Sequence, residues 1–369
     1  MNETPGPARG REWEGAKGHS EHKGKTTLTI ATLLAALVGV ALGVVVLPVR
    51  PAVADPVGSV NEGSHEVWVI DQSDTTADGG GTLYIYTGEF LAGAAAPNAV
   101  PEVIDLGGAA RNRCLAQTGT APRRPHMIEM NAAHSHAIIA FVATGQVLFM
   151  DAATRTPLTC VDVGLQVHAA MPTPDQRYVV VANQNGKLLQ RIKTDYGANA
   201  FQLEDGATLD LANGTTPSGA PRQDPSLRPD NAPICPIIES ASRFAFVTLR
   251  GGGLFVVDVT ATPMAIVAEY DQDTVHPNGC GGAEATGKIY INSGGGTAAN
   301  PLEPDLYAFP LGAYSATPSP PNTPAPVLGL QPRRPRICRL ARGRSHQGWT
   351  LSLDRGPGRQ PRHGRGHDH

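Results

Sequence analysis

Three histidines recur at matching places in the sequence and could together bind a metal ion. His126, His168 and His276 each stand at or near the start of a segment that contains an apolar strand, a turn and a hairpin. Neutral imidazole is a ligand for transition metals such as zinc, copper and iron. If these segments are arranged around one axis, the three side chains converge on it, which predicts a divalent or transition-metal site. Alternatively, each histidine only bonds to the backbone of a neighbouring segment.

Three glutamates recur in a similar way, near the end of the first strand of successive segments. They are Glu129, Glu239 and Glu284, which precede the residue that opens the next strand by seven, four and four positions. Such a ring of carboxylates could bind Ca²⁺ or supply a general base. The alternative is that they are solvated acids of surface turns.

The cysteines allow two disulfides. Four of the five lie in the body of the chain, and Cys338 lies in its C-terminal tail. Cys235 and Cys280 occupy matching places in adjacent segments, which predicts a disulfide between them and leaves Cys114 with Cys160 as the second pair. Buried free thiols, reactive thiols or a thiolate–histidine metal site are the alternatives.

The elements that must position these residues are short strands and tight turns. The stretch 168–192, HAAMPTPDQRYVVVANQNGKLLQRI, gives a β-branched strand at 177–183, a turn at Asn185-Gly186 and a second strand from Lys187. The same pattern recurs in four segments, whose second strands open at His136, Arg177, Arg243 and Lys288. The distances between successive opening residues are 41, 66 and 45 residues. The polar stretch 206–231 explains the long spacing as an inserted loop.

A four-strand unit that recurs every ~40–45 residues is typical of a β-propeller. The 42 glycines, 32 prolines and low content of charged residues, 17%, also favour short strands over a helical bundle. We therefore predict an all-β propeller of four-stranded antiparallel blades, with about five to six blades in this chain.

The segment TPDQRYVVVANQNGKLLQRI at 173–192 resembles the repeat of the YVTN-type, lactonase-like bacterial propellers, which are extracytoplasmic. In weaker form the resemblance extends over residues 66–310. It implies about seven blades, so the ring predicted here is incomplete. It also implies a hydrolase function at the mouth of the central channel as the alternative to a binding function.

The ends of the chain differ from this body. Residues 1–27 are predicted to be a cytoplasmic polar segment, and residues 28–54 a signal peptide or an N-terminal membrane anchor, because the uncharged run 28–49 precedes Ala52-Val53-Ala54. The propeller is predicted at 55–330, and a disordered Arg/Gly/Pro-rich tail at 331–369. Allowing free codon choice, a one-base shift from Arg339 onward gives another repeat of the same kind, which predicts that this tail is out of frame.

Charge limits the partners. Residues 331–369 hold ten Arg and two Asp and so carry a charge of +8, and residues 1–54 carry +2. Because the net charge of the whole chain is −3, the body from 55 to 330 carries −13. An acidic body disfavours nucleic-acid binding. We predict a monomeric, extracytoplasmic binding or scaffold module for a protein, glycan, small molecule or cell-wall ligand, secreted or anchored through residues 28–49. The alternative is a propeller enzyme, a lactonase-like hydrolase or a metal-dependent oxidase. No G-x-S-x-G, H-E-x-x-H or C-x-x-C motif is present in the sequence.

Overall fold

A computed structural model describes residues 65–72, 79–91, 93–294 and 305–316, together with the short strands at 327–328, 344–345 and 348–349. These residues belong to one compact unit, Ser59–His369. The predicted export segment at 28–54, Cys338 and most of the tail at 331–369 lie outside the described residues. No helix within the described part of the chain is both long and apolar enough to cross a membrane.

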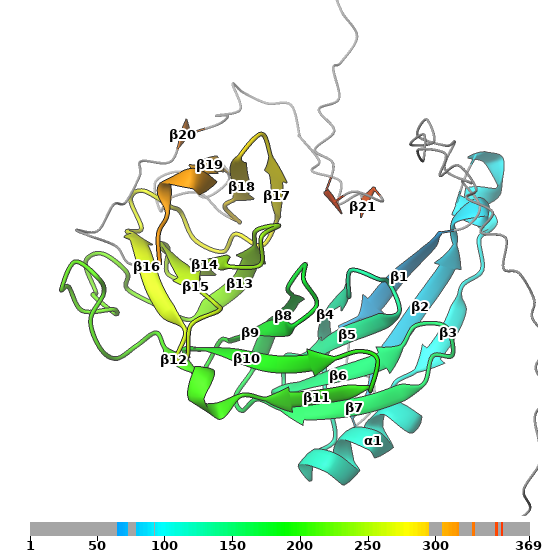
Figure 1. The fold of residues 1–369 in the computed structure, drawn as a ribbon. Coiled ribbons are helices and arrows are strands. Elements are labelled where there is room, and N and C mark those ends of the chain that lie inside the picture. The colour runs from blue at the N-terminus through cyan, green and yellow to red at the C-terminus, as the bar shows by residue number, and fades with distance from the viewer. Residues whose placement is uncertain are drawn as a thin grey trace, which may run out of the picture. The chain divides into compact units, whose positions relative to one another are not determined.

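The described residues form five antiparallel sheets of three or more strands in chain order (Figure 1), and a separate two-stranded pair. The first sheet contains β1 (Glu66–Asp71), β2 (Thr82–Thr87) and β3 (Glu102–Asp105). The second contains β4 (Pro125–Met130), β5 (His136–Phe141), β6 (Gln146–Asp151) and β7 (Pro157–Asp162). The third contains β8 (Val167–Pro172), β9 (Tyr178–Asn183), β10 (Leu188–Asp195), β11 (Ala200–Leu203) and β12 (Leu209–Asp210).

The fourth sheet contains β13 (Pro233–Ile238), β14 (Phe244–Leu249), β15 (Leu254–Asp258) and β16 (Ala265–Tyr270). The fifth contains β17 (Gly282–Ala285), β18 (Lys288–Asn292), β19 (Leu306–Pro310) and β20 (Val327–Leu328). The other elements are helix α1 (Ala109–Thr118), the 3-10 turns η1 (Gly88–Leu91), η2 (Gly93–Asn98), η3 (Asp205–Ala207) and η4 (Leu311–Ala313), and the pair β21 (Arg344–Ser345) and β22 (Gly348–Trp349).

Local chemistry explains why each sheet is a meander. In the third sheet, the Thr173 hydroxyl donates to Asp175 Oδ1 at 2.6 Å and Gln176 takes a left-handed φ of 62°, which closes the turn between β8 and β9. Asn183 Oδ1 then accepts the Gly186 amide at 3.0 Å and fixes the hairpin between β9 and β10. The strands predicted at 177–183 and from Lys187 to Ile192 are thus confirmed, although the second one runs from Leu188 to Asp195.

The core lies between successive sheets. Four separate clusters of buried apolar residues each join one sheet to the next along the chain. Alternate residues of one strand enter different clusters: in β5, Ile139 packs toward the first sheet and Ile138 toward the third. The middle strands are therefore buried on both faces, as β5 and β14 are along their whole length.

The innermost strands are neighbours in space: β1 contacts β4, β4 contacts β8, and β8 contacts β13. Sheets that stack face to face with adjacent inner strands are the blades of a propeller. The predicted fold is confirmed, with five blades among the described residues. Figure 1 shows the first and the fifth sheet apart from each other, with the other three between them.

One element departs from the all-β prediction. Helix α1 follows the first sheet and ends at Gly119, which takes a left-handed φ of 75° and donates its amide to Leu115 O. The helix packs against β7, the outermost strand of the second sheet. Its buried side chains are Ala110 and Cys114, and Cys114 is joined to Cys160 of β7 by a disulfide with a Cα–Cα distance of 4.9 Å.

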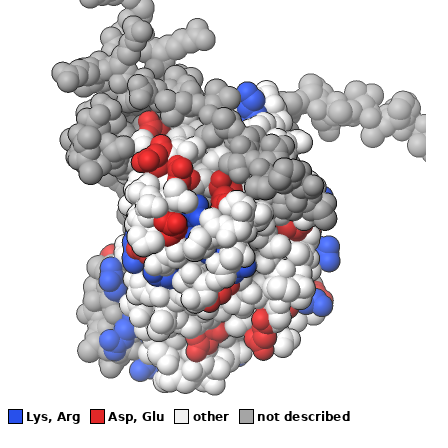
Figure 2. All heavy atoms as spheres, turned by 90° about the vertical axis from the view of Figure 1, so that its left-hand side faces the viewer, with Lys and Arg blue, Asp and Glu red and all other residues white. Residues whose placement is uncertain are grey.

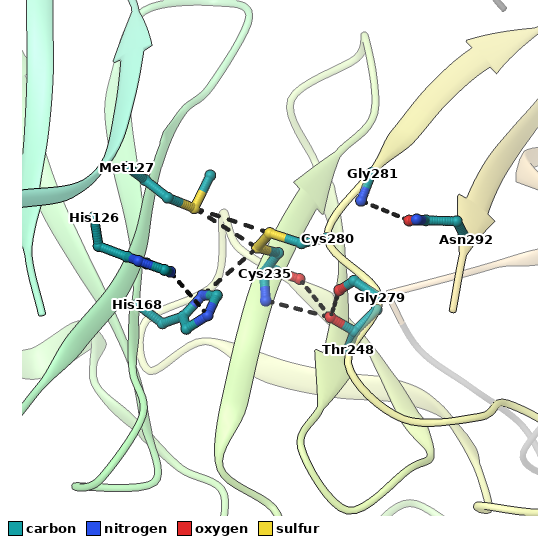
Figure 3. Close-up of a disulfide and its surroundings, with 9 residues drawn as sticks. All are labelled: His126, Met127, His168, Cys235, Thr248, Gly279, Cys280, Gly281 and Asn292. Carbon is teal, nitrogen blue, oxygen red and sulfur yellow. Dashed lines mark hydrogen bonds between the residues drawn. A yellow bond between two sulfur atoms is a disulfide. The ribbon is translucent and has the colours of Figure 1, made fainter. Parts of the chain in front are cut away.

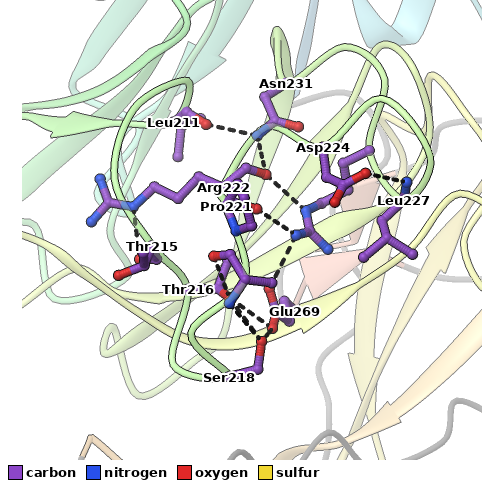
Figure 4. Close-up of polar contacts among 12 residues, drawn as sticks. Leu211, Thr215, Thr216, Ser218, Pro221, Arg222, Asp224, Leu227, Asn231 and Glu269 are labelled. Atoms are coloured by element: carbon purple, nitrogen blue, oxygen red, sulfur yellow. Dashed lines mark hydrogen bonds and ion pairs between the residues drawn. The ribbon is translucent and has the colours of Figure 1, made fainter.

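The predicted inserted loop at 206–231 is present, but it contains the short strand β12, which pairs with β10. The rest of the loop is held by polar contacts (Figure 4). Arg228, only 2% exposed, donates to Arg222 O at 2.9 Å and Pro221 O at 3.0 Å, and forms an ion pair with Glu269 at 3.3 Å. The side-chain amide of Asn231 donates from Nδ2 to Arg222 O at 2.7 Å. A buried guanidinium therefore ties this loop to strand β16.

Candidate functional site

Bulges at the start of three inner strands position the predicted ligands. The ladder register shifts around His126 in β4, around His168 in β8, and around Ile234 and Cys235 in β13. A bulge re-aims the side chain of its extra residue. Three successive blades thus present a nitrogen or sulfur donor at the same level of their innermost strands.

The two histidines contact each other directly. His126 Nε2 and His168 Nε2 are 3.1 Å apart, and the ring centroids are separated by 4.4 Å. One nitrogen must donate and the other accept, so the pair shares one proton along this contact. Burial, together with the nearby His126, lowers the pKa of His168 to about 4. His168 is accordingly neutral at pH 7.

Sulfur atoms adjoin this pair (Figure 3). Cys235 and Cys280 are joined by a disulfide, with their Cα atoms 5.1 Å apart. The Met127 Sδ atom lies 3.9 Å from the sulfur of each cysteine, and His168 Nδ1 lies 3.9 Å from Cys235 Sγ. The donor atoms of His168, Cys235 and Cys280 all lie within 4.8 Å of one another.

His276 occupies a different environment. It lies between β16 and β17, where its Nδ1 is 2.5 Å from Asp305 Oδ2 and its amide donates to the Tyr307 hydroxyl at 3.0 Å. Among the described residues, the one metal-ligand grouping contains His168 but not His276. Instead of His276, the fifth blade contributes Cys280, which lies two residues before β17 and belongs to the group with His168 and Cys235. The predicted convergence of three histidines is therefore replaced by two histidines and two cysteines.

Met127 was not singled out by sequence reasoning. Its signal is its place directly after His126 in the bulged start of an inner strand, but the bulge is visible only in the ladder register. Its side chain is 7% exposed and belongs to the core cluster between the second and third sheets.

A cavity of about 710 Å³ opens where the inner strands β4, β8, β13 and β17 end. Its walls are formed by Glu129, Met130, Ala132, His134, Met171, Pro172, Thr173, Pro174, Pro236, Ile237, Ile238, Ser240, Cys280, Gly282, Ala283, Glu284, Ala285, Thr286 and Ile289. Two of the three predicted glutamates are among them. The described lining residues include no Lys or Arg, so the charge on the cavity wall is acidic.

The glutamates have distinct surroundings. Glu284 is exposed, and its oxygens accept the Ser240 amide at 2.7 Å and the Ser240 hydroxyl at 2.9 Å. Glu129 is 8% exposed. Glu239 does not line the cavity; its oxygen accepts the Phe244 amide at 3.0 Å, and burial raises the pKa of its carboxyl group. Glu239 thus closes its own turn, while Glu129 and Glu284 face a ligand-sized space.

Acidification is expected to destabilise the folded chain through His168. The unfolded state takes up a proton near pH 6.5, whereas the folded state does so only at about 4. Between these values the unfolded state binds more protons, so the free energy of unfolding falls as the pH drops through this window and is unaffected by this group above it. Urea unfolding of the wild type and His168→Asn at several pH values measures the effect. The variant should show the shallower slope; identical slopes would contradict the assignment.

Comparison with known proteins places the fold only loosely. No family model and no curated protein sequence matches the chain. A protein of unknown function from Desulfotomaculum acetoxidans has a TM-score of 0.40 at 12% identity, over 69% of this chain and 70% of its own. A candidate 6-phosphogluconolactonase from Bacteroides fragilis scores 0.43 at 12% identity, over 71% of each chain. The β-propeller domain of Cps50 from Myceliophteria thermophila scores 0.39 at 10% identity, over 57% of this chain and 60% of its own. All these scores are below 0.5, so the assignment of the described residues to a propeller depends on their own sheets.

Proposed function

We propose that this chain is an extracytoplasmic propeller that binds a ligand in the cavity at the ends of its inner strands. The carrying observation is the cavity itself: about 710 Å³ of space whose walls come from four successive blades. Ligand sites in proteins are clefts of about 300–1,000 Å³ with apolar walls and a few polar groups. Here Met171, Pro172, Ile237 and Ile289 supply apolar surface.

The charges on the wall favour one class of ligand. Glu129 and Glu284 offer carboxylate oxygens, which accept hydrogen bonds from hydroxyl and ammonium groups. A phosphorylated sugar would meet these acids without a cationic partner among the described lining residues, which costs binding energy. We infer that the ligand is a glycan or small molecule that presents hydroxyl or ammonium groups, such as a cell-wall amino sugar.

The charges on one face of the molecule agree with the same choice. Figure 2 shows one face of the molecule, on which Lys and Arg side chains lie among Asp and Glu and form no extended basic area. Binding to a nucleic-acid backbone requires such an area. Binding of a neutral or cationic ligand does not require an extended basic area.

We also infer that residues 28–54 carry the body out of the cytosol. Two cysteine pairs at disulfide distance support an oxidising compartment, since disulfides persist there and are rare in the cytosol. The apolar run at 28–49 supplies the means of export.

Replacing both cavity acids is expected to weaken binding of a cationic sugar by roughly 100- to 10,000-fold, because hydrogen bonds to charged groups contribute about 1.5–3 kcal/mol each. Calorimetric titration with glucosamine oligomers, N-acetylglucosamine oligomers and a sugar phosphate measures this in the wild type and in Glu129→Gln/Glu284→Gln. The matched control is Glu89→Gln, an exposed acid that does not line the cavity. Preferential binding of the sugar phosphate, or unchanged affinity in the double variant, would refute the proposal.

The enzyme alternative uses the same cavity, with a glutamate as general base. It predicts turnover of a neutral lactone that disappears in Glu129→Gln or Glu284→Gln. Binding without turnover favours the binding module, and turnover favours the enzyme. The two outcomes are distinguished by adding a lactone to the chain and measuring acid release.

A further inference from the structure

The sulfur and nitrogen donors beside the disulfide form a second candidate site. Its role does not depend on which ligand the cavity binds. We propose that, when the Cys235–Cys280 disulfide is reduced, the two thiolates, Met127 Sδ and His168 Nδ1 bind one copper(I) ion. In the disulfide form, Met127 Sδ already lies 3.9 Å from each cysteine sulfur, and His168 Nδ1 lies 3.9 Å from Cys235 Sγ. They come from β4, β8, β13 and the segment before β17, so four blades contribute.

The donor set selects the metal. Thiolate and thioether sulfur are soft ligands that prefer copper(I), and imidazole suits copper as well as zinc. Zinc sites in proteins use Cys, His, Asp and Glu, so the thioether of Met127 adds nothing for zinc. Carboxylates are absent from the described metal-ligand group. Copper(I) is therefore the ion that uses all four donors.

His126 acts as the positioning residue. When His168 Nε2–H donates to His126 Nε2 across their 3.1 Å contact, the lone pair of His168 Nδ1 faces Cys235 Sγ. The other ring nitrogen of a metal-bound histidine is commonly held in this way, which fixes the tautomer.

Access comes through the cavity. Cys280 is partly exposed and lines the cavity wall, whereas Cys235 is fully buried. A dithiol reductant that enters the cavity attacks Cys280 Sγ; the S–S bond breaks and Cys235 leaves as a thiolate. The second thiol of the reductant then releases Cys280 and closes the reductant into its own disulfide. Two electrons and two protons pass from the reductant to the protein, and copper(I) binding displaces the thiol protons.

The other disulfide provides an internal control. Cys114 and Cys160 are also buried, but neither belongs to the metal-ligand group found among the described residues. The backbone amide of Cys160 donates to Gln117 Oε1 at 2.7 Å. Reduction of this pair yields two thiols outside the group formed by Met127, His168, Cys235 and Cys280.

The test is a copper(I) titration of the full-length chain after anaerobic reduction with a dithiol and removal of the reductant, against a chromophoric copper(I) chelator. The reduced wild type and Cys114→Ala/Cys160→Ala should each bind one more copper(I) than Cys235→Ala/Cys280→Ala, which keeps the same histidines near the C-terminus. The non-reduced wild type gives a second baseline and should bind no more copper than that variant. X-ray absorption of the bound copper should show sulfur-dominated ligation.

Met127→Leu keeps the side-chain volume and removes the thioether. It should weaken copper(I) binding by at least about tenfold and leave zinc binding unchanged, because even the partners of metal ligands alter affinity by about 10- to 100-fold. Equal copper binding in the reduced wild type, its non-reduced form and Cys235→Ala/Cys280→Ala would overturn the site. A zinc preference that Met127→Leu does not alter would overturn the choice of metal. Neither result depends on what the cavity binds.

Discussion

Replacing Arg228 by methionine is expected to lower the free energy of unfolding by about 3–5 kcal/mol, the range observed when one partner of a buried ion pair is removed. The Arg228 guanidinium is 2% exposed and Glu269 is 11% exposed. Methionine fills much of the volume but leaves the Glu269 carboxylate buried without its cation. It also removes one donor from the carbonyl groups of Pro221 and Arg222, of which Arg222 O keeps the side-chain amide of Asn231. Chemical denaturation monitored by circular dichroism measures the loss.

Two comparisons separate burial from charge. Arg250→Met removes a guanidinium that is 44% exposed and pairs with Asp230 at 2.6 Å, and it should cost less than about 1 kcal/mol. Arg228→Met/Glu269→Gln removes both charges and should be more stable than Arg228→Met alone. If the double variant is no better than the single one, the uncompensated carboxylate is not the cause of the loss.

Removing the Cys114–Cys160 disulfide is expected to cost about 2–4 kcal/mol. The bond closes a separation of 46 residues between α1 and β7 and so restricts the unfolded chain. The helix has only two buried side chains, Ala110 and Cys114 itself, so apolar packing gives it little independent support. Urea unfolding of Cys114→Ala/Cys160→Ala under non-reducing conditions measures the loss. Hydrogen exchange should increase first in residues 109–118.

The neighbouring position on the helix supplies the control. Leu115 is 40% exposed, and Leu115→Ala should change the free energy of unfolding by less than about 0.5 kcal/mol. Unfolding midpoints that agree between the cysteine double variant and the wild type would mean that the crosslink does not stabilise this helix against β7.

The propeller could be predicted because its signals are local. Strands such as Tyr178–Asn183 follow from β-branched residues, and the hairpin after them follows from Asn185-Gly186. Helix α1 could not be predicted in this way. Its residues show no apolar periodicity, and its position depends on a bond to Cys160, 46 residues away.

The candidate site was predictable only in part. The sequence predicts His126 and His168 at the start of inner strands, and the structure places both of them there. His276 was matched to them because the stretch NGCGGAEATG contains no β-branched strand signal before its end, which hid the start of β17 at Gly282. The approach of Met127 to the two cysteines arises from packing between blades. No spacing within one repeat encodes such a contact.

The bulges at His126, at His168 and at Ile234-Cys235 also have a meaning for how such a molecule can diversify. Each blade contributes its own side chain to one level of the axis, and the backbone that holds it does not depend on which side chain is chosen. Donors at this level can therefore be exchanged one codon at a time while the surrounding sheets stay intact. A scaffold of this kind separates the evolution of its inner chemistry from the maintenance of its fold.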